Sequence, residues 1–170
     1  MIWRQDNAAA AVIGSYDRLY GRRRPADPAL IKVHALAQLI GRQEQLNERM
    51  QFILEAAALT HDIGIKNGEA KFGAGKCSGK TQELEGPPAA AELLAKLGFA
   101  PDVCERVCYL IGHHHTYTNI DGMDYQILVE ADFLVNFYED GMSKEAIQTA
   151  CGRIFKTASG IRLCRQMFGI

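Results

Sequence analysis

Apolar residues recur every three or four positions along most of this chain, and the strict alternation typical of β-strands is nearly absent. Each such segment can bury one helical face against its neighbours, so the sequence predicts an all-α, single-domain helical bundle. The expected helices cover residues 7–20, 28–41, 47–62, 87–97, 101–114, 125–139, 143–156 and 160–168.

Several residues mark where these helices begin or end. Asn47 and Ser143 precede helical segments and can serve as N-caps, whose side chains accept a backbone N–H of the first turn. Proline suits a first turn and glycine suits a helix end, because of their backbone preferences. The prolines and glycines placed in this way are Pro28, Pro88, Pro101, Gly41 and Gly98.

Residues 63–86 depart from this pattern, since they hold six glycines and four lysines with almost no apolar periodicity. A loop of that length in a compact domain is usually functional or disordered. We expect either a basic lid, with Lys66, Lys76 and Lys80 contacting an anionic substrate, or a mobile loop whose lysines face water.

Part of this segment, GAGKCSGKT, is similar to a phosphate-binding loop of nucleotide-binding proteins. That motif needs a glycine where this chain has Ala74, and it follows a buried strand, for which the preceding GEAKF lacks the apolar run. We therefore reject an ATP-binding loop here.

The dipeptide His61-Asp62 lies at the end of the apolar run 56–59, and Gly64 stops the helix soon after. Adjacent helical side chains diverge by about 100°, so the pair can offer two neighbouring ligands to one metal ion. Alternatively, Asp62 caps a loop and His61 is a core imidazole with a satisfied hydrogen bond.

Three further helices direct a ligand-type side chain toward the core. His34 lies on the apolar face of 28–41, and Asp132 lies on that of 125–139, where an unpaired carboxylate needs a cation or strong donors. In the run 113–115, helical spacing places His114 inward and the two flanking histidines at the rim. The sequence thus predicts that His34, His61, Asp62 and Asp132 share a divalent ion.

The order His34, His61-Asp62, Asp132 resembles the signature of the HD superfamily of metal-dependent phosphohydrolases, with LTHDIG and VEADFL as its best-recognised segments. The resemblance runs from about His34 to Phe137. It implies one domain over 1–170, with a metal-site core at about 28–139 and C-terminal helices at 140–170 packing on it.

Some members of this superfamily add two histidines and hold a second ion. His114 resembles the second of these histidines, whereas Glu85 stands where the first would be. Glu85 is either a ligand to the second ion or an anion favoured by a nearby helix N-terminus. The resemblance implies one or two divalent transition ions (Fe, Mn, Ni, Zn or Co), with Mg also open.

The implied activity is hydrolysis of a phosphate ester or anhydride bond in a nucleotide or other small phosphorylated metabolite. Asp62 would orient a metal-activated water, and Lys66 would neutralise phosphate charge unless it is simply solvated. His113 is a further catalytic candidate, and His115 and Tyr117 are candidates for contact with the leaving group, although exposed rim positions explain both histidines equally well. Two alternatives are a non-catalytic nucleotide sensor and a di-iron oxygenase on similar ligands.

The balance of charges limits the partners of the chain. A net charge of -1, from 19 basic and 20 acidic residues, argues against general nucleic-acid binding or an anionic membrane surface. No apolar stretch reaches the roughly 20 residues of a membrane span, and Asp6 interrupts any signal peptide, so we expect a cytoplasmic protein. Five cysteines without CxxC spacing suggest neither a disulfide framework nor a zinc knuckle. A homodimer is left open.

Overall fold

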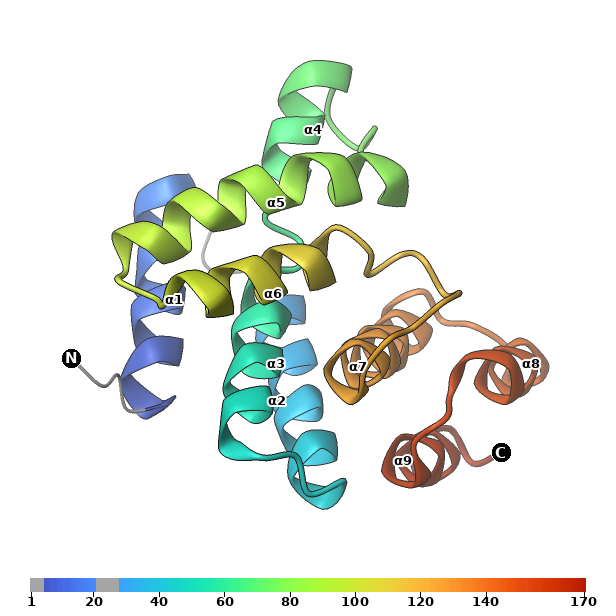
Figure 1. Ribbon diagram of the computed structural model, residues 1–170. Coiled ribbons are helices and arrows are strands. Elements are labelled where there is room, and N and C mark those ends of the chain that lie inside the picture. The colour runs from blue at the N-terminus through green and yellow to red at the C-terminus, as the bar shows by residue number, and fades with distance from the viewer. Residues whose placement is uncertain (1–4, 21–27) are drawn as a thin grey trace.

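The computed structural model describes residues 5–20 and 28–170; in the first of these ranges it describes the side chains of residues 8–15. Within these ranges the chain forms nine α-helices and no strand, which confirms the predicted all-α bundle (Figure 1). The helices are α1 (Gln5–Tyr20), α2 (Pro28–Gln43), α3 (Glu48–Thr60), α4 (Ile65–Phe72), α5 (Gly79–Lys96), α6 (Pro101–Ile111), α7 (Met123–Glu139), α8 (Lys144–Ile154) and α9 (Ala158–Phe168).

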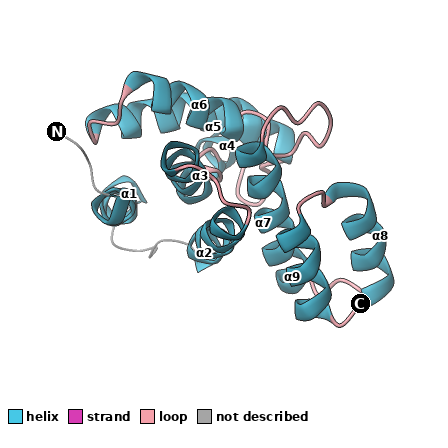
Figure 2. Ribbon diagram, turned by 60° about the horizontal axis from the view of Figure 1, so that its bottom comes forward, coloured by secondary structure: helices cyan, strands magenta, loops and turns pink. Residues whose placement is uncertain are grey.

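Helix α3 is the centre of the bundle. It packs against α1, α2, α6 and α7, while α5 lies along α6 at one end of the molecule (Figures 1 and 2). Residues 53–60 of α3 are all buried, so the helix is enclosed on every side. An apolar helix surrounded in this way carries the residues at its end, His61 and Asp62, into the interior.

Most of the helix ends that the sequence predicted are found in the structure. Asn47 accepts a hydrogen bond from Met50 N at 2.8 Å, and Ser143 caps α8 in the same manner. The predicted stop at Gly41 was wrong, because α2 continues to Gln43. A Cβ at Gly41 would meet Gln51 Oε1 at 2.3 Å, so this glycine is needed for close packing of α2 on α3.

The prediction of a long loop at 63–86 was also wrong, since α4 and the first turns of α5 occupy most of it. Ser78 caps α5 through a hydrogen bond from Thr81 N, and Pro88 lies inside that helix rather than in its first turn. The glycines here permit close contact: a Cβ at Gly64 would lie 2.6 Å from Gly86 N, and one at Gly86 would lie 2.5 Å from Ile111 Cγ2.

The C-terminal helices join the bundle through aromatic side chains. Phe137 of α7 lies between Phe155 and Phe168, with ring centroids 6.1 Å and 5.8 Å away. The buried carboxylate of Glu130 accepts the N–H groups of Lys156 and Thr157 at 2.6 Å and 3.0 Å, just before α9 begins. Among the described helices, none has the length and apolar character needed to cross a membrane.

Candidate metal centre

His61 follows the last turn of α3 and is almost completely buried. Its Nδ1 donates to the carbonyl of Ala58 at 2.8 Å, because a carbonyl oxygen can only accept. The other ring nitrogen, Nε2, faces two carboxylates, 3.3 Å from Asp62 Oδ2 and 3.5 Å from Asp132 Oδ1. The backbone thus fixes the ring so that Nε2 points at the acidic groups.

His114 has the same arrangement at the end of α6. Its Nδ1 donates to the carbonyl of Ile111 at 2.7 Å, and its Nε2 is buried without a hydrogen-bond partner. This nitrogen lies 3.8 Å from Asp62 Oδ1. The rings of His61 and His114 meet edge to face with centroids 5.4 Å apart, and the prediction that His114 is the inward histidine of its run is in line with its full burial.

Asp62 lies between the two imidazoles, with one carboxylate oxygen toward each. Its side chain is 28 % exposed, whereas those of the two histidines are buried, so the site opens to solvent on the side of Asp62. Burial alone would raise the pKa of Asp62, but His61 and the other histidines outweigh that effect and hold it at about 2. Asp62 is therefore an anion throughout the physiological pH range.

The pKa values of the two histidines move in opposite directions. Burial alone would lower the pKa of His61, but the neighbouring Asp62 and Asp132 raise it well above its ordinary value. Burial and the nearby His61 and His115 lower the pKa of His114 to about 4. At neutral pH His114 consequently offers a lone pair on Nε2.

His115 also belongs to this group, although helical spacing placed it at the rim, as a candidate for contact with the leaving group. Ligand atoms of Asp62, His114 and His115 lie within 4.8 Å of one another. The Nε2 of His115 is 2.9 Å from Gln82 Oε1 on α5, a contact that the sequence analysis missed. Gln82 had no recognisable signal, because it lies in the segment that was expected to be a loop.

The pairwise spacing of these donor atoms is close to that of two ligands of one divalent metal ion. Donor atoms that each lie about 2.0–2.2 Å from one ion are separated by about 3–3.5 Å from each other. The separations of 3.3, 3.5 and 3.8 Å around His61 and Asp62 are close to that range. A buried imidazole nitrogen without a partner is also costly unless a proton or a metal ion satisfies it.

Four contacts hold residues 113–116, the histidine turn, in place. Glu83 of α5 accepts hydrogen bonds from His115 N and Thr116 Oγ1 at 3.1 Å and 2.8 Å. The hydroxyl of Tyr125 donates to the carbonyl of His113 at 2.7 Å and also contacts that of Thr116. Burial, followed by nearby acidic groups, raises the pKa of Tyr125 to about 12, so this hydroxyl remains a donor.

A further set of contacts lies farther along the connection between α6 and α7. Arg106 of α6 forms paired hydrogen bonds with Asp121, at 2.9 Å and 3.0 Å, and with Asp124, at 2.8 Å and 2.9 Å. The guanidinium thereby ties α6 to the start of α7 on the far side of the histidine turn.

His34 is not brought into the cluster. Its Nε2 lies 3.4 Å from Glu55 Oε2, an ion-pair distance without hydrogen-bond geometry, so this nitrogen too is buried without a hydrogen-bond partner. Glu55 accepts hydrogen bonds from Gln38 and Gln51. Glu55 precedes His61 by six residues, which is about 9 Å of helix. The structure therefore joins three of the four predicted ligands, and a metal role for His34 stays a prediction that this arrangement does not support.

Glu85 is buried in the interior of α5, where Lys71 Nζ lies 2.6 Å from its Oε1. Glu85 is therefore not at a helix N-terminus, so the alternative explanation, an anion favoured by the helix N-terminus, was wrong. Lys80 is exposed and lies 3.4 Å from Glu83, and Lys76 lies on the exposed connection between α4 and α5. Substrate contact by these two lysines is a prediction that the geometry leaves open.

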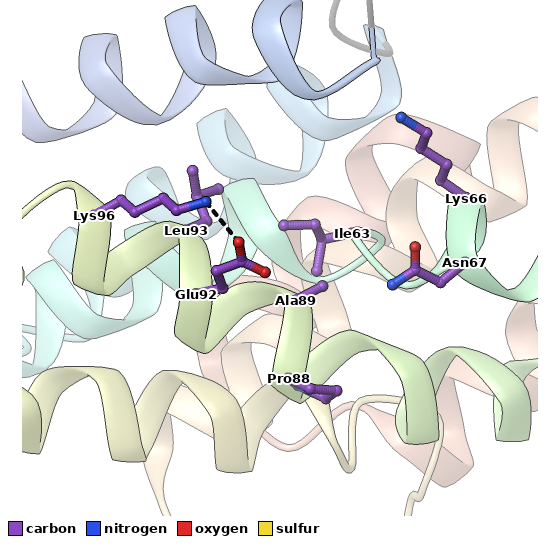
Figure 3. Close-up of a pocket in the computed structure, with 8 residues that line it drawn as sticks. All are labelled: Ile63, Lys66, Asn67, Pro88, Ala89, Glu92, Leu93 and Lys96. Atoms are coloured by element: carbon purple, nitrogen blue, oxygen red, sulfur yellow. Dashed lines mark hydrogen bonds and ion pairs between the residues drawn. The ribbon is translucent and has the colours of Figure 1, made fainter.

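Lys66 lines a different cavity, of about 280 Å³, between α4 and α5. Figure 3 shows Lys66 and Asn67 on one side of this cavity and the ion pair of Lys96 and Glu92 on the other. His61, Asp62 and His114 are not among its lining residues. The role of Lys66 in neutralising phosphate thus stays a prediction.

The last two candidates, His113 and Tyr117, lie at the start of the histidine turn and just after its end. His113 donates from Nδ1 to the carbonyl of Tyr109 at 2.7 Å, and its ring stacks on the ring of Tyr109 with centroids 4.3 Å apart. Tyr117 lies beside Phe133 of α7, and its hydroxyl is 3.4 Å from His115 Nδ1.

Comparison with known families gives one match, to the HD domain, over residues 30–159. The match covers most of the chain and includes His61, Asp62, His114 and Asp132. No curated protein and no solved structure matches the chain closely enough to count as a relative.

Proposed function

Because this chain belongs to the HD domain family, we propose that it is a metal-dependent phosphohydrolase that cleaves an ester or anhydride bond of a nucleotide or other small phosphorylated metabolite. The observation that carries the proposal is the position of Asp62, whose two oxygens face the Nε2 atoms of His61 and His114. Nitrogen and carboxylate ligands of this kind suit divalent transition metal ions.

The side chains fall into two sets that share Asp62. His61 and Asp132 lie on the side of Oδ2, and His114 lies on the side of Oδ1 with His115 beside it. One ion would be held by the first set, and a second ion by the other set. When bound, the ion supplies a water of lowered pKa and a Lewis acid for a phosphoryl oxygen.

The side chains of the site have separate roles. His61 and His114 are fixed by backbone carbonyls, so each holds its Nε2 in place before any ligand arrives. Asp62 is more exposed than His61, His114 and Asp132, so it is positioned to accept a hydrogen bond from the attacking water. The neighbouring histidines keep the pKa of Asp62 below its ordinary value, so it is an anion that can orient this water.

The test uses protein freed of metal by a chelator, reloaded with Mn²⁺, Co²⁺, Ni²⁺, Zn²⁺ or, without oxygen, Fe²⁺. We expect metal-dependent phosphate release from a panel of nucleotides and simple phosphate esters. Asp62→Asn should lower the rate by at least about 100-fold, because it weakens a shared ligand without changing its shape. Asp140→Asn, the same exchange at an exposed position after α7, should retain full activity.

Four outcomes would contradict the proposal. Phosphate release that needs no metal, or that survives Asp62→Asn, would remove the metal centre from the reaction. Oxygen uptake by the iron-loaded protein without phosphate release would support the di-iron oxygenase, and nucleotide binding without turnover would support the sensor.

A further inference from the structure

A groove of about 500 Å³ lies between the aromatic pair Tyr117–Phe133 and helix α8. We propose that this groove binds the base of a nucleotide, so that the substrate of the proposed phosphohydrolase is a nucleoside phosphate rather than an aliphatic phosphate ester. The inference rests on the proposed function for the phosphate end of the ligand. The binding of the base stands on the groove alone.

One wall of the groove is aromatic. The rings of Tyr117 and Phe133 lie 5.0 Å apart at 60°, an edge-to-face pair. Tyr117 is 40 % exposed and Phe133 is half-buried, so part of each ring remains open to a ligand. Aromatic rings of this kind stack on nucleobases of any sequence, because every base presents a flat π-face.

The opposite wall is one face of α8. Ala146 and Ala150 lie four residues apart and thus one above the other on the helix, and their short side chains leave room for a flat ring. Arg153 and Glu145 line the same groove. A guanidinium donates hydrogen bonds and a carboxylate accepts them, and the edge of a base needs partners of both kinds.

One side chain, Tyr117, both lines the groove and approaches the candidate metal centre. The hydroxyl of Tyr117 lies 3.4 Å from Nδ1 of His115, and His115 has a ligand atom within 4.8 Å of those of Asp62 and His114. In this proposal, a ligand with its phosphate at the metal centre extends past His115 into the groove.

The size of the groove favours a small molecule over a protein partner. A volume of about 500 Å³ lies within the roughly 300–1,000 Å³ typical of ligand pockets. An aliphatic ester such as glycerol phosphate would reach the cluster and leave the aromatic wall in contact with water. A nucleoside phosphate satisfies both ends of the site.

The experiment measures binding of adenosine, guanosine and uridine, which lack phosphate, to metal-free protein by saturation-transfer NMR and equilibrium dialysis. We expect all three nucleosides to bind and ribose to give no signal. Ala150→Phe fills the groove from α8, and Phe133→Ala removes part of its aromatic wall, so each should raise the nucleoside Kd at least tenfold. Ala95→Phe, on an exposed position of α5, serves as the matched control and should leave the Kd unchanged.

A second measurement uses the metal-loaded protein. Ala150→Phe should raise KM for 5′-nucleotides at least tenfold with little change in kcat, and it should leave KM for glycerol phosphate unchanged. Failure of nucleosides to bind, or equal binding by wild type and both groove variants, would overturn the groove as a base site. If nucleosides bind as expected but no substrate releases phosphate, the proposed hydrolase fails and the base site stands.

Discussion

Asp62 Oδ1 lies 3.8 Å from Nε2 of His114, across the junction between the end of α3 and the end of α6. The two helices pack side by side, so the pair depends on the packing of segments far apart in the sequence. Both residues belong to the same candidate metal centre.

The two neighbouring histidines 113 and 114 provide a matched test of the ligand assignment. His114→Gln should remove one ion per chain or lower its affinity by at least about tenfold, because its buried Nε2 faces Asp62. His113→Gln should leave the metal content unchanged, since that ring stacks on Tyr109. Elemental analysis after dialysis against each metal measures both, and an equal loss in the two variants would contradict the assignment.

His34→Ala tests whether His34 binds the metal ion, as the sequence predicted, or only packs beside Glu55. We expect the metal content to match that of the wild type, because the ring pairs with Glu55 instead of the cluster. The free energy of unfolding should fall by about 1–3 kcal/mol, since the substitution leaves a buried carboxylate with fewer partners. Loss of metal with unchanged stability would restore His34 as a ligand.

Tyr125→Phe tests how the histidine turn is held. The variant loses the hydroxyl that donates to the carbonyl of His113, so it should be less stable by about 1–3 kcal/mol. Metal affinity should weaken by about 10- to 100-fold, because the turn that carries His114 and His115 becomes less constrained. Tyr138→Phe, at an exposed position on α7, is the control in both thermal unfolding and metal titration.

The pair of Arg106 and Asp121 predicts a specific dependence of stability on pH. Hydrogen bonding to Arg106 lowers the pKa of Asp121 below its ordinary value in the folded state. The stabilisation is therefore fully present above the unfolded pKa of about 3.9 and is lost as the pH falls through the lower folded value. Because Asp121 is largely exposed, its contribution should be only about 0.2–1 kcal/mol.

Asp121→Asn gives the measurement for this pair. The difference in unfolding free energy between wild type and variant should be constant from pH 5 to 7 and should shrink toward zero in more acidic buffer. A difference that persists after the carboxyl group is protonated would show that the charge is not its source.

Two glycine substitutions test the close packing of α4 on α5. Gly64→Ala should destabilise the protein by about 1–3 kcal/mol, because the new Cβ would lie 2.6 Å from the backbone N of Gly86. Gly152→Ala, on an exposed position inside α8 with no atom within 4 Å of the new Cβ, should instead stabilise by up to about 1 kcal/mol. Chemical denaturation of both variants measures the contrast, and equal effects would exclude steric packing as the role of Gly64.

The all-α class, the positions of most helices and the N-caps at Asn47 and Ser143 could be predicted from the sequence. These features depend on apolar periodicity and on hydrogen bonds within one turn, which are local properties of the chain. The inward direction of His114 was predictable for the same reason, because it follows from the face shared with Val107 and Leu110.

The tertiary structure alone decided the rest. In a sequence, a glycine of a flexible loop cannot be told from a glycine that allows two helices to pack closely. The short distance between Gly64 and Gly86 shows that the glycines here allow α4 to pack on α5. The pairing of His34 with Glu55, the support of His115 by Gln82 and the groove beside Tyr117 likewise join segments far apart in the sequence. Their energies come from contacts between helices, which the periodicity of a single helix does not specify.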